Sequence, residues 1–347
     1  MLERVAEEIA RSGGWISFAR YMEIVLHAPG GYYAGGARKF GAQGDFVTAP
    51  ELGSLFGRTL ARQLRGLPFG RILEFGAGSG ALAQTLLKEL PCEYFILETS
   101  ADLRERQRER LGDRVQWLER LPERFRGVVI ANEVLDAMPV HALAWRAGGI
   151  VERGVVMQGD ALAWSDRPAS GELLDEARKL DVMPPYESEI GLVARAWMRG
   201  LAENLEQGVA FLVDYGFPRH EYYHPQRSGG TLMCHHRHTA HGDVFARPGL
   251  EDMTAHVDFS AIAQAAREGG LEVLGYATQA QFLVNCGITD VLGEANVENA
   301  LHYAPIAAEA NKLLSPAEMG ELFKVLAVGR GAPALGGFSH NDRWHTL

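Results

Sequence analysis

The sequence feature that most constrains the fold is a glycine-rich turn between a short apolar strand and a helix. The turn Gly76-Ala77-Gly78-Ser79-Gly80 follows the strand pattern Arg71-Ile72-Leu73-Glu74-Phe75 and precedes an amphipathic helix over 81–90. Further apolar strands over 94–98 and 128–131 alternate with helical segments. This alternation predicts an α/β fold with a parallel, doubly wound sheet. A glycine turn after the first strand of such a sheet is where nucleotides bind, because the ligand must approach the backbone closely.

The patterns along the 347 residues divide the chain into five segments. We expect an N-terminal cap over 1–70, the first half of a Rossmann-like nucleotide-binding domain over 71–140, inserted strands and helices over 141–207, the second half of that domain over 208–330 and a loose tail over 331–347. The second half contains a long loop rich in His, Gly and Pro over 215–256. A loop of this length inside a compact domain is usually functional.

Composition excludes several classes of protein. The net charge of −10 opposes binding to nucleic acid, whose phosphates attract basic surfaces. The three cysteines are widely spaced and form no CxxC pair, so neither a disulfide framework nor a thiolate zinc site is predicted. The first residues lack the apolar core of a signal peptide, and no run of about 18 apolar residues predicts a membrane span. We therefore expect a cytoplasmic protein, and the sequence does not indicate its oligomeric state.

One carboxylate beside the glycine turn favours S-adenosylmethionine as its ligand, and a second fits any nucleoside cofactor. Gly76, Gly78 and Ala81 also satisfy the dinucleotide fingerprint, so an NAD(P)-dependent oxidoreductase is an alternative. Glu74, however, lies two residues before the first glycine, as in class I methyltransferases, where a carboxylate organises the ammonium-bearing methionine end that a dinucleotide lacks. Glu98 closes the next strand, where it can accept both ribose hydroxyls of either cofactor.

Several motifs resemble those of the MidA-like (mitochondrial dysfunction protein A) methyltransferases. They are Gly44-Asp45-Phe46-Val47-Thr48-Ala49-Pro50-Glu51-Leu52, Ser17-Phe18-Ala19-Arg20-Tyr21-Met22, Pro29-Gly30-Gly31-Tyr32-Tyr33, the glycine turn, Asn132-Glu133-x-Leu135-Asp136-Ala137-x-Pro139, Val213-Asp214-Tyr215-Gly216, Gly230-Thr231-Leu232 and Thr254-Ala255-His256-Val257-Asp258-Phe259. The matches run from about residue 12 to residue 330. The resemblance implies a class I methyltransferase fold, Rossmann-like and doubly wound, with an N-terminal cap and inserted segments.

The resemblance also implies a protein substrate. Eukaryotic members of this family are mitochondrial assembly factors of respiratory complex I and dimethylate an arginine of a core subunit. This chain has no obvious Arg/Ser-rich transit segment, which is typical of a bacterial, cytoplasmic member and leaves the respiratory substrate open. A small-molecule methyltransferase and a cofactor-binding assembly factor without turnover are the further alternatives.

Asn132, Glu133 and Asp136 are the predicted catalytic residues, at the end of the fourth strand. An arginine substrate requires carboxylates that clamp its guanidinium in a bidentate manner. If a helical turn begins at Glu133, the three-residue spacing places Glu133 and Asp136 on one side of it. The alternative is that Asn132 or Asp136 only caps a following helix.

Four further residues are predicted to complete the site. Asp45 and Thr48 lie in the N-terminal cap and are expected to close over the methionine end, although the spacing from Thr48 to Glu51 also fits a helix capping box. Tyr215 and His256 are predicted to bind substrate, with a core aromatic and a buried, hydrogen-bonded histidine as the alternatives.

The histidines of the long loop invite a metal interpretation that their spacing does not support. They are His220, His224, His235, His236, His238 and His241. Because they form no HExxH motif and no thiolate pair accompanies them, we expect no metal. His238 shares with His256 the interpretation of a pocket residue or general base.

Overall fold

The computed structural model describes residues 1–34, 48–237, 239–296 and 298–347. Its largest sheet has eight strands in the order β15-β16-β10-β5-β2-β3-β4, with β14 paired to β10. The strands are β2 (Arg71–Phe75), β3 (Glu93–Leu97), β4 (Gln116–Leu118), β5 (Phe125–Asn132), β10 (Leu205–Phe217), β14 (Val257–Asp258), β15 (Glu272–Thr278) and β16 (Phe323–Arg330). Strands β10, β5, β2, β3 and β4 run parallel, whereas β16 runs antiparallel to both of its neighbours. The predicted doubly wound, mostly parallel sheet is confirmed.

Helices cover both faces of this sheet. Successive side chains of a strand point to opposite faces, and the central strands carry apolar side chains on both. Ile72, Val128 and Phe211 pack on one face, whereas Leu73 and Val129 pack on the other. The first face is covered by α4 (Leu55–Arg65), α5 (Ala81–Glu89), α11 (Gln279–Asn285), α12 (Ile288–Gly293) and α13 (Ala300–Leu314). The second is covered by α8 (Leu192–Asn204) and α10 (Phe259–Glu268). Burial on both faces explains why the central strands read as continuous apolar runs.

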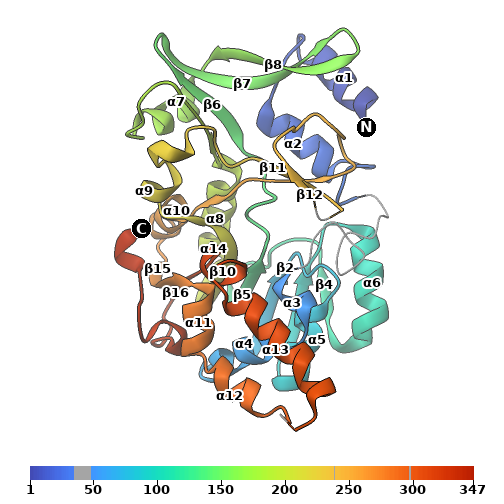
Figure 1. Cartoon of the computed structure of the whole chain (residues 1–347), viewed down its shortest axis with the longest axis vertical. Helices are drawn as coiled ribbons and strands as arrows, with labels where there is room; N and C mark the ends of the chain where they lie inside the picture. The colour runs from blue at the N-terminus through green and yellow to red at the C-terminus, as the bar shows by residue number, and fades with distance from the viewer. Residues whose placement is uncertain (35–47, 238, 297) are drawn as a thin grey trace.

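A second, antiparallel sheet joins the N-terminal segment to the insertion. Its order is β1-β7-β6-β9, with β8 paired to β7. The elements of this region are α1 (Leu2–Arg11), β1 (Ile16–Ser17), α2 (Phe18–His27), β6 (His141–Arg146), β7 (Gly149–Gln158), β8 (Ala161–Pro168), α7 (Gly171–Arg178) and β9 (Tyr186–Ile190). In Figure 1 this sheet lies with α1 and α2 at one end of the long axis, and the parallel strands lie toward the other.

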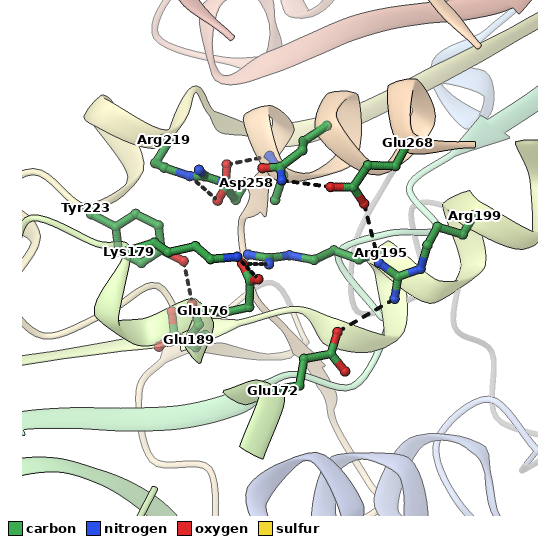
Figure 2. A network of polar contacts seen from close by, with 12 residues as sticks. Glu172, Glu176, Lys179, Glu189, Arg195, Arg199, Arg219, Tyr223, Asp258 and Glu268 are labelled. Carbon is green, nitrogen blue, oxygen red and sulfur yellow. Dashed lines mark hydrogen bonds and ion pairs between the residues drawn. The ribbon is translucent and has the colours of Figure 1, made fainter. Parts of the chain in front are cut away.

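An ion-pair network anchors the insertion to the helices of the parallel sheet (Figure 2). Arg195 on α8, which is only 8% exposed, donates to Glu176 on α7 over 2.5 Å. One turn further along α8, Arg199 lies 3.9 Å from Glu172 on α7 and 3.9 Å from Glu268 on α10. Helix α8 therefore contacts α7 of the insertion on one side and α10 of the nucleotide-binding domain on the other.

The segment over 215–256 is not the unstructured loop that its composition predicted. It contains α9 (Arg219–Tyr222) and a third sheet of order β12-β11-β13, formed by β11 (Met233–His236), β12 (Thr239–His241) and β13 (Asp252–Thr254). Strand β10 also continues to Phe217. These strands are too short for the periodicity of the sequence to reveal them, and they are stable because their buried side chains pack against α2.

The expectation of a loose tail over 331–347 is also wrong. Leu335 and Phe338 are 5% and 7% exposed, and the ring of Phe338 packs on Phe282 with centroids 5.2 Å apart. Asn285 donates to the carbonyl oxygen of Gly337. Only two large apolar side chains of this segment, all of which is described, are buried, and this pattern is too weak to predict from sequence.

The remaining elements are four-residue helices, 3₁₀ turns and one longer helix, α6. They are α3 (Ala49–Leu52), α6 (Ala101–Leu111), α14 (Met319–Leu322) and the 3₁₀ turns Gly112–Arg114, Pro225–Arg227, Gly336–Phe338 and Trp344–Thr346. None of the helices formed by the described residues has the length and apolar character needed to cross a bilayer.

Candidate functional site

A cavity of about 1050 Å³ lies at the carboxyl ends of the parallel strands. The strand order reverses between β2 and β5, and ligands of doubly wound sheets bind in the crevice at such a point. The glycine loop, the ends of β3 and β5 and the third sheet contribute to its walls, as do His27 of α2 and Thr48 at the start of α3. The cavity is therefore enclosed jointly by the nucleotide-binding domain, the N-terminal segment and the segment over 215–256.

The glycine loop has the conformation that close ligand approach requires. Gly76, Gly78 and Gly80 have φ values of 58°, 52° and 81°, which side chains with a Cβ rarely adopt. Gly76 and Gly78 line the cavity. Gly80 is not among the described residues that line the cavity. It is instead the N-cap of α5 and packs on Leu111. The structure therefore places two of the three predicted glycines in the cavity wall.

Glu98 is held in place by a residue that the sequence analysis did not single out. Its Oε1 accepts from the amide of Ser100 at 2.9 Å, and its Oε2 accepts from Gln107 Nε2 at 3.3 Å. The same nitrogen of Gln107 donates to the carbonyl oxygen of Gly78 at 2.9 Å. Trp117 Nε1 donates to Gln107 Oε1 at 2.9 Å. Gln107 is fully buried and joins the glycine loop to the predicted ribose ligand.

A signal for Gln107 was present in the sequence. It occupies an inward-facing position of α6, one helical repeat after Leu103 and one before Leu111. A polar side chain in such a stripe is buried only where it finds partners.

Glu74 lines the cavity from the end of β2. It is 3% exposed, and Tyr94 donates its hydroxyl proton to Glu74 Oε2 at 2.7 Å. Burial raises the pKa of Glu74 to about 7, and the negative charge of Glu98 acts in the same direction. A cationic group in the cavity would offset both effects.

The residues after β5 form a tight turn with carboxylates on it. Glu133 has a φ of 53°, which is uncommon for a residue other than glycine and is found at functional sites. Asn132 Nδ2 donates to Glu133 Oε1 at 3.1 Å. Burial raises the pKa of Glu133 to about 8, with a further contribution from the charge of Asp136.

Asp136 faces the same cavity. The hydroxyl of Tyr215 donates to Asp136 Oδ2 at 2.5 Å, and among the described residues Oδ1 has no hydrogen-bond partner. Burial raises the pKa of Asp136 to about 6. In residues 133–140, all of which are described, no helix begins, so the alternative that Asn132 or Asp136 caps a helix is wrong.

Asp214 fixes this turn from β10. Its Oδ2 accepts from the amides of Val134, Leu135 and Asp136 at 3.2, 2.9 and 3.3 Å. Burial raises the pKa of Asp214 well above its usual range, and the negative charges of Asp136 and Glu133 act in the same direction. Three amide hydrogen bonds to one carboxylate therefore stabilise the turn, in place of the helical turn that the sequence suggested.

Tyr215 and His256 both line the cavity, and their rings meet edge to face with centroids 5.2 Å apart. The His256 ring also stacks on Phe217. Its Nδ1 is buried without a partner among the described residues, so the alternative of a hydrogen-bonded core histidine does not hold for that atom. Burial lowers the pKa of His256 to about 4, and the charge of Arg227 acts in the same direction.

The N-terminal segment closes the cavity through Tyr33 and Glu51. Tyr33 donates its hydroxyl proton to Asp252 Oδ1 on β13 at 2.8 Å, which ties this segment to the third sheet. Ser79 of the glycine loop donates to Glu51. Thr48 lines the cavity and is the N-cap of α3, but within the described part of the chain its side chain makes no capping hydrogen bond. Asp45 lies outside the described residues.

Among the described residues, no two histidines of the segment over 215–256 belong to one group of potential metal ligands. His220 is exposed, His224 accepts from the amide of Gln226, and His235 lines the cavity. His241 contacts Glu251, and His238 lies outside the described residues.

The chemistry of the cavity fits S-adenosylmethionine. The glycine loop leaves the space that a Cβ would fill: at Gly76 that atom would lie 3.2 Å from Val134 Cγ2. Glu98 presents a buried carboxylate beside the loop, where ribose hydroxyls can donate to it. Acceptor oxygens of Asn132 and Asp136 that have no partner among the described residues supply further sites for donors of a cationic ligand.

Comparisons with known proteins agree with this fit. A family model described as "Putative S-adenosyl-L-methionine-dependent methyltransferase" matches residues 55–277. The chain is 30% identical to the protein arginine methyltransferase NDUFAF7 homolog, mitochondrial, of Drosophila melanogaster, over 96% of this chain and 85% of that protein. It is 28% identical to the human protein arginine methyltransferase NDUFAF7, mitochondrial, over 92% and 81%. A protein from Burkholderia thailandensis, whose crystal structure contains bound S-adenosyl-homocysteine, is 51% identical to this chain. The two structures match with a TM-score of 0.96 over 100% of this chain and 96% of that chain.

Proposed function

The chain belongs to this family of S-adenosylmethionine-dependent methyltransferases, and on that premise we propose that it methylates an arginine side chain of a protein substrate. Its sheet is the class I methyltransferase fold, with the reversed strand β16 inserted beside β10. Family membership sets aside the NAD(P)-dependent oxidoreductase. The relatives named as arginine methyltransferases support the substrate class, and their names place them in mitochondria.

The observation that carries the proposal is the set of buried carboxylates around one end of the cavity. Glu133 and Asp136 line it, together with Asp252 from the third sheet. Asp136 and Asp252 are 5% and 3% exposed. Burial raises the pKa of Glu133 and of Asp136, and within the described part of the chain no cationic side chain lies among the causes that offset it. A guanidinium has five N–H donors and no acceptor, which matches a surface of carboxylates.

In the proposed reaction the cofactor supplies an electrophilic sulfonium methyl group, and the protein positions the attacking nitrogen. Glu133 and Asp136 hold the guanidinium, and Asp214 keeps both on one turn through the three amides it accepts. The positive charge of the bound guanidinium lowers the pKa of Glu133, so its carboxylate is ionised when substrate is present. It then accepts the proton that the nitrogen loses on methylation. Positioning and electrostatics supply most of the catalysis.

We place the cofactor between the glycine loop and the N-terminal segment. Gly76 and Gly78 would contact it through backbone, Glu98 would hold its ribose, and Glu74 and Thr48 would face its methionine end. Tyr215 and His256 would line the substrate side. His256, with a pKa lowered to about 4, is neutral at physiological pH and offers its unpartnered Nδ1 as a hydrogen-bonding group.

The experiment that tests the proposal is quantitative mass spectrometry of methylarginine in cells with and without this protein, followed by transfer of labelled methyl groups in lysate. We expect arginine methylation of one or a few proteins to disappear without the protein. Asp136→Asn should bind S-adenosyl-homocysteine normally and lose transfer. Label found only in the small-molecule fraction would assign a small-molecule substrate. If the wild type binds the cofactor but transfers no methyl group, and if Asp136→Asn keeps full cellular function, the protein is an assembly factor without turnover.

A further inference from the structure

Three potential metal ligands meet on the third sheet, on the face turned away from the cofactor cavity. Cys234 on β11 lies directly opposite His241 on β12, and Glu251 immediately precedes β13. One ligand atom from each of the three lies within 4.8 Å of the others. In the described part of the chain this is the only such group.

The alternation of the strands separates this cluster from the cavity. His235, Ala240 and Asp252 each neighbour one of the three residues in sequence, and all three line the cavity. Because successive side chains of a strand point to opposite faces, Cys234, His241 and Glu251 lie on the other face. There Cys234 packs among the side chains of α1 and α2, with no exposed surface.

One carboxylate oxygen in the cluster lacks a partner. Glu251 is 3% exposed, and its Oε2 contacts His241 Nε2 at 3.0 Å and Arg247 Nη1 at 3.6 Å. Among the described residues its Oε1 has no hydrogen-bond partner. A buried acceptor that is left without a hydrogen bond destabilises the folded protein. A bound cation would remove that destabilisation.

We propose that Cys234, His241 and Glu251 bind one zinc ion, which fixes the third sheet against the N-terminal helices. A thiolate, an imidazole and a carboxylate form a donor set that zinc accepts, with the fourth tetrahedral position left to water. Zinc–ligand distances of about 2.0–2.3 Å place ligand atoms roughly 3.3–3.8 Å apart, so closing the site requires movement of about 1 Å. The ion would stabilise the cavity wall and take no part in methyl transfer.

The sequence alone concealed this site, because its three donors belong to no zinc motif. Cys234 is a single thiol, His241 is one of seven histidines in the segment over 215–256, and Glu251 lies ten residues beyond His241. Antiparallel pairing of β11 with both β12 and β13 brings them together.

The test is metal content and affinity of the untagged full chain, with Cys234→Ser and Glu251→Gln as variants. Cys286→Ser is the matched control, since Cys286 is also buried but lies in the core between the parallel sheet and α11. Zinc is measured by elemental mass spectrometry and titrated against a chromogenic chelator. Cobalt is added separately to detect a thiolate-to-cobalt charge-transfer band.

We expect about one zinc per chain in the wild type and in Cys286→Ser, and at least a ~100-fold weaker affinity in Cys234→Ser. The cobalt band should be present in the wild type. Should Cys234→Ser fail to fold, the wild-type titration decides alone. A wild type that binds zinc no more tightly than micromolar, or that gives no thiolate band with cobalt, would overturn the site. Neither result depends on methyltransferase activity.

Discussion

Gln107 should control cofactor affinity although it lies behind the cavity wall. Its side chain donates to the carbonyl oxygen of Gly78 and to the carboxylate of Glu98, and it accepts from Trp117. Gln107→Leu removes a hydrogen bond to a charged group, worth about 1.5–3 kcal/mol, and one to a neutral carbonyl, worth about 1 kcal/mol. Part of this loss falls on stability, because the indole N–H of Trp117 is left buried without an acceptor.

The rest of the lost hydrogen-bond energy affects cofactor binding, because Gln107 holds Glu98 and the glycine loop in fixed positions relative to each other. About 1.4–2 kcal/mol of it corresponds to a 10- to 30-fold increase in the Kd for S-adenosyl-homocysteine. Gln107→Glu keeps the shape and an acceptor for Trp117 but places a second carboxyl group beside Glu98. We therefore expect its affinity to recover as the pH falls and the introduced carboxyl group is protonated, whereas that of Gln107→Leu should not.

Isothermal titration calorimetry with S-adenosyl-homocysteine at several pH values measures these effects. Gln264→Leu is the matched control, because Gln264 is exposed on α10 and bonds only within its own helix, to Glu268. It should leave the Kd unchanged. A folded Gln107→Leu variant whose Kd stays within about twofold of the wild type, a difference near 0.4 kcal/mol, would refute the positioning role.

Three further changes test other parts of the structure. Burial raises the pKa of Glu133 to about 8, so between the unfolded value near 4.5 and about pH 8 the native state binds more protons than the unfolded state, and stability falls as pH rises. Glu133→Gln should therefore raise the Tm more at pH 8 than at pH 5 in differential scanning calorimetry, and equal shifts would contradict this. Tyr33→Phe removes one hydrogen bond to the buried Asp252 and should lower the free energy of unfolding in urea by about 1–3 kcal/mol. Phe338→Ala opens a cavity beside Phe282 and should cost about 3 kcal/mol, whereas an unpacked tail would give no change.

The fold could be predicted from sequence where the signal is local and long. Strand β2, the glycine loop and α5 follow one another within twenty residues, and each carries its own pattern. The third sheet gave no such signal, because β12 and β13 have three residues each and β13 pairs with β11 instead of with β12, which precedes it in sequence. The turn after β5 was located correctly but was expected to lead into a helix, since Asp214, which stabilises it instead, lies about eighty residues away.

By itself the sequence determined the order of the strands and helices of the parallel sheet, the conformation of the glycine loop and the presence of carboxylates at the strand ends. These follow from the apolar period, from the backbone freedom of glycine and from the rule that parallel strands bring their carboxyl ends to one edge. Only the tertiary structure decided which polar groups are buried together. Gln107 beside Glu98, Tyr33 beside Asp252 and Cys234 opposite His241 all depend on contacts between separate elements. Burial and pairing set the charge state of such groups, and neither is encoded locally.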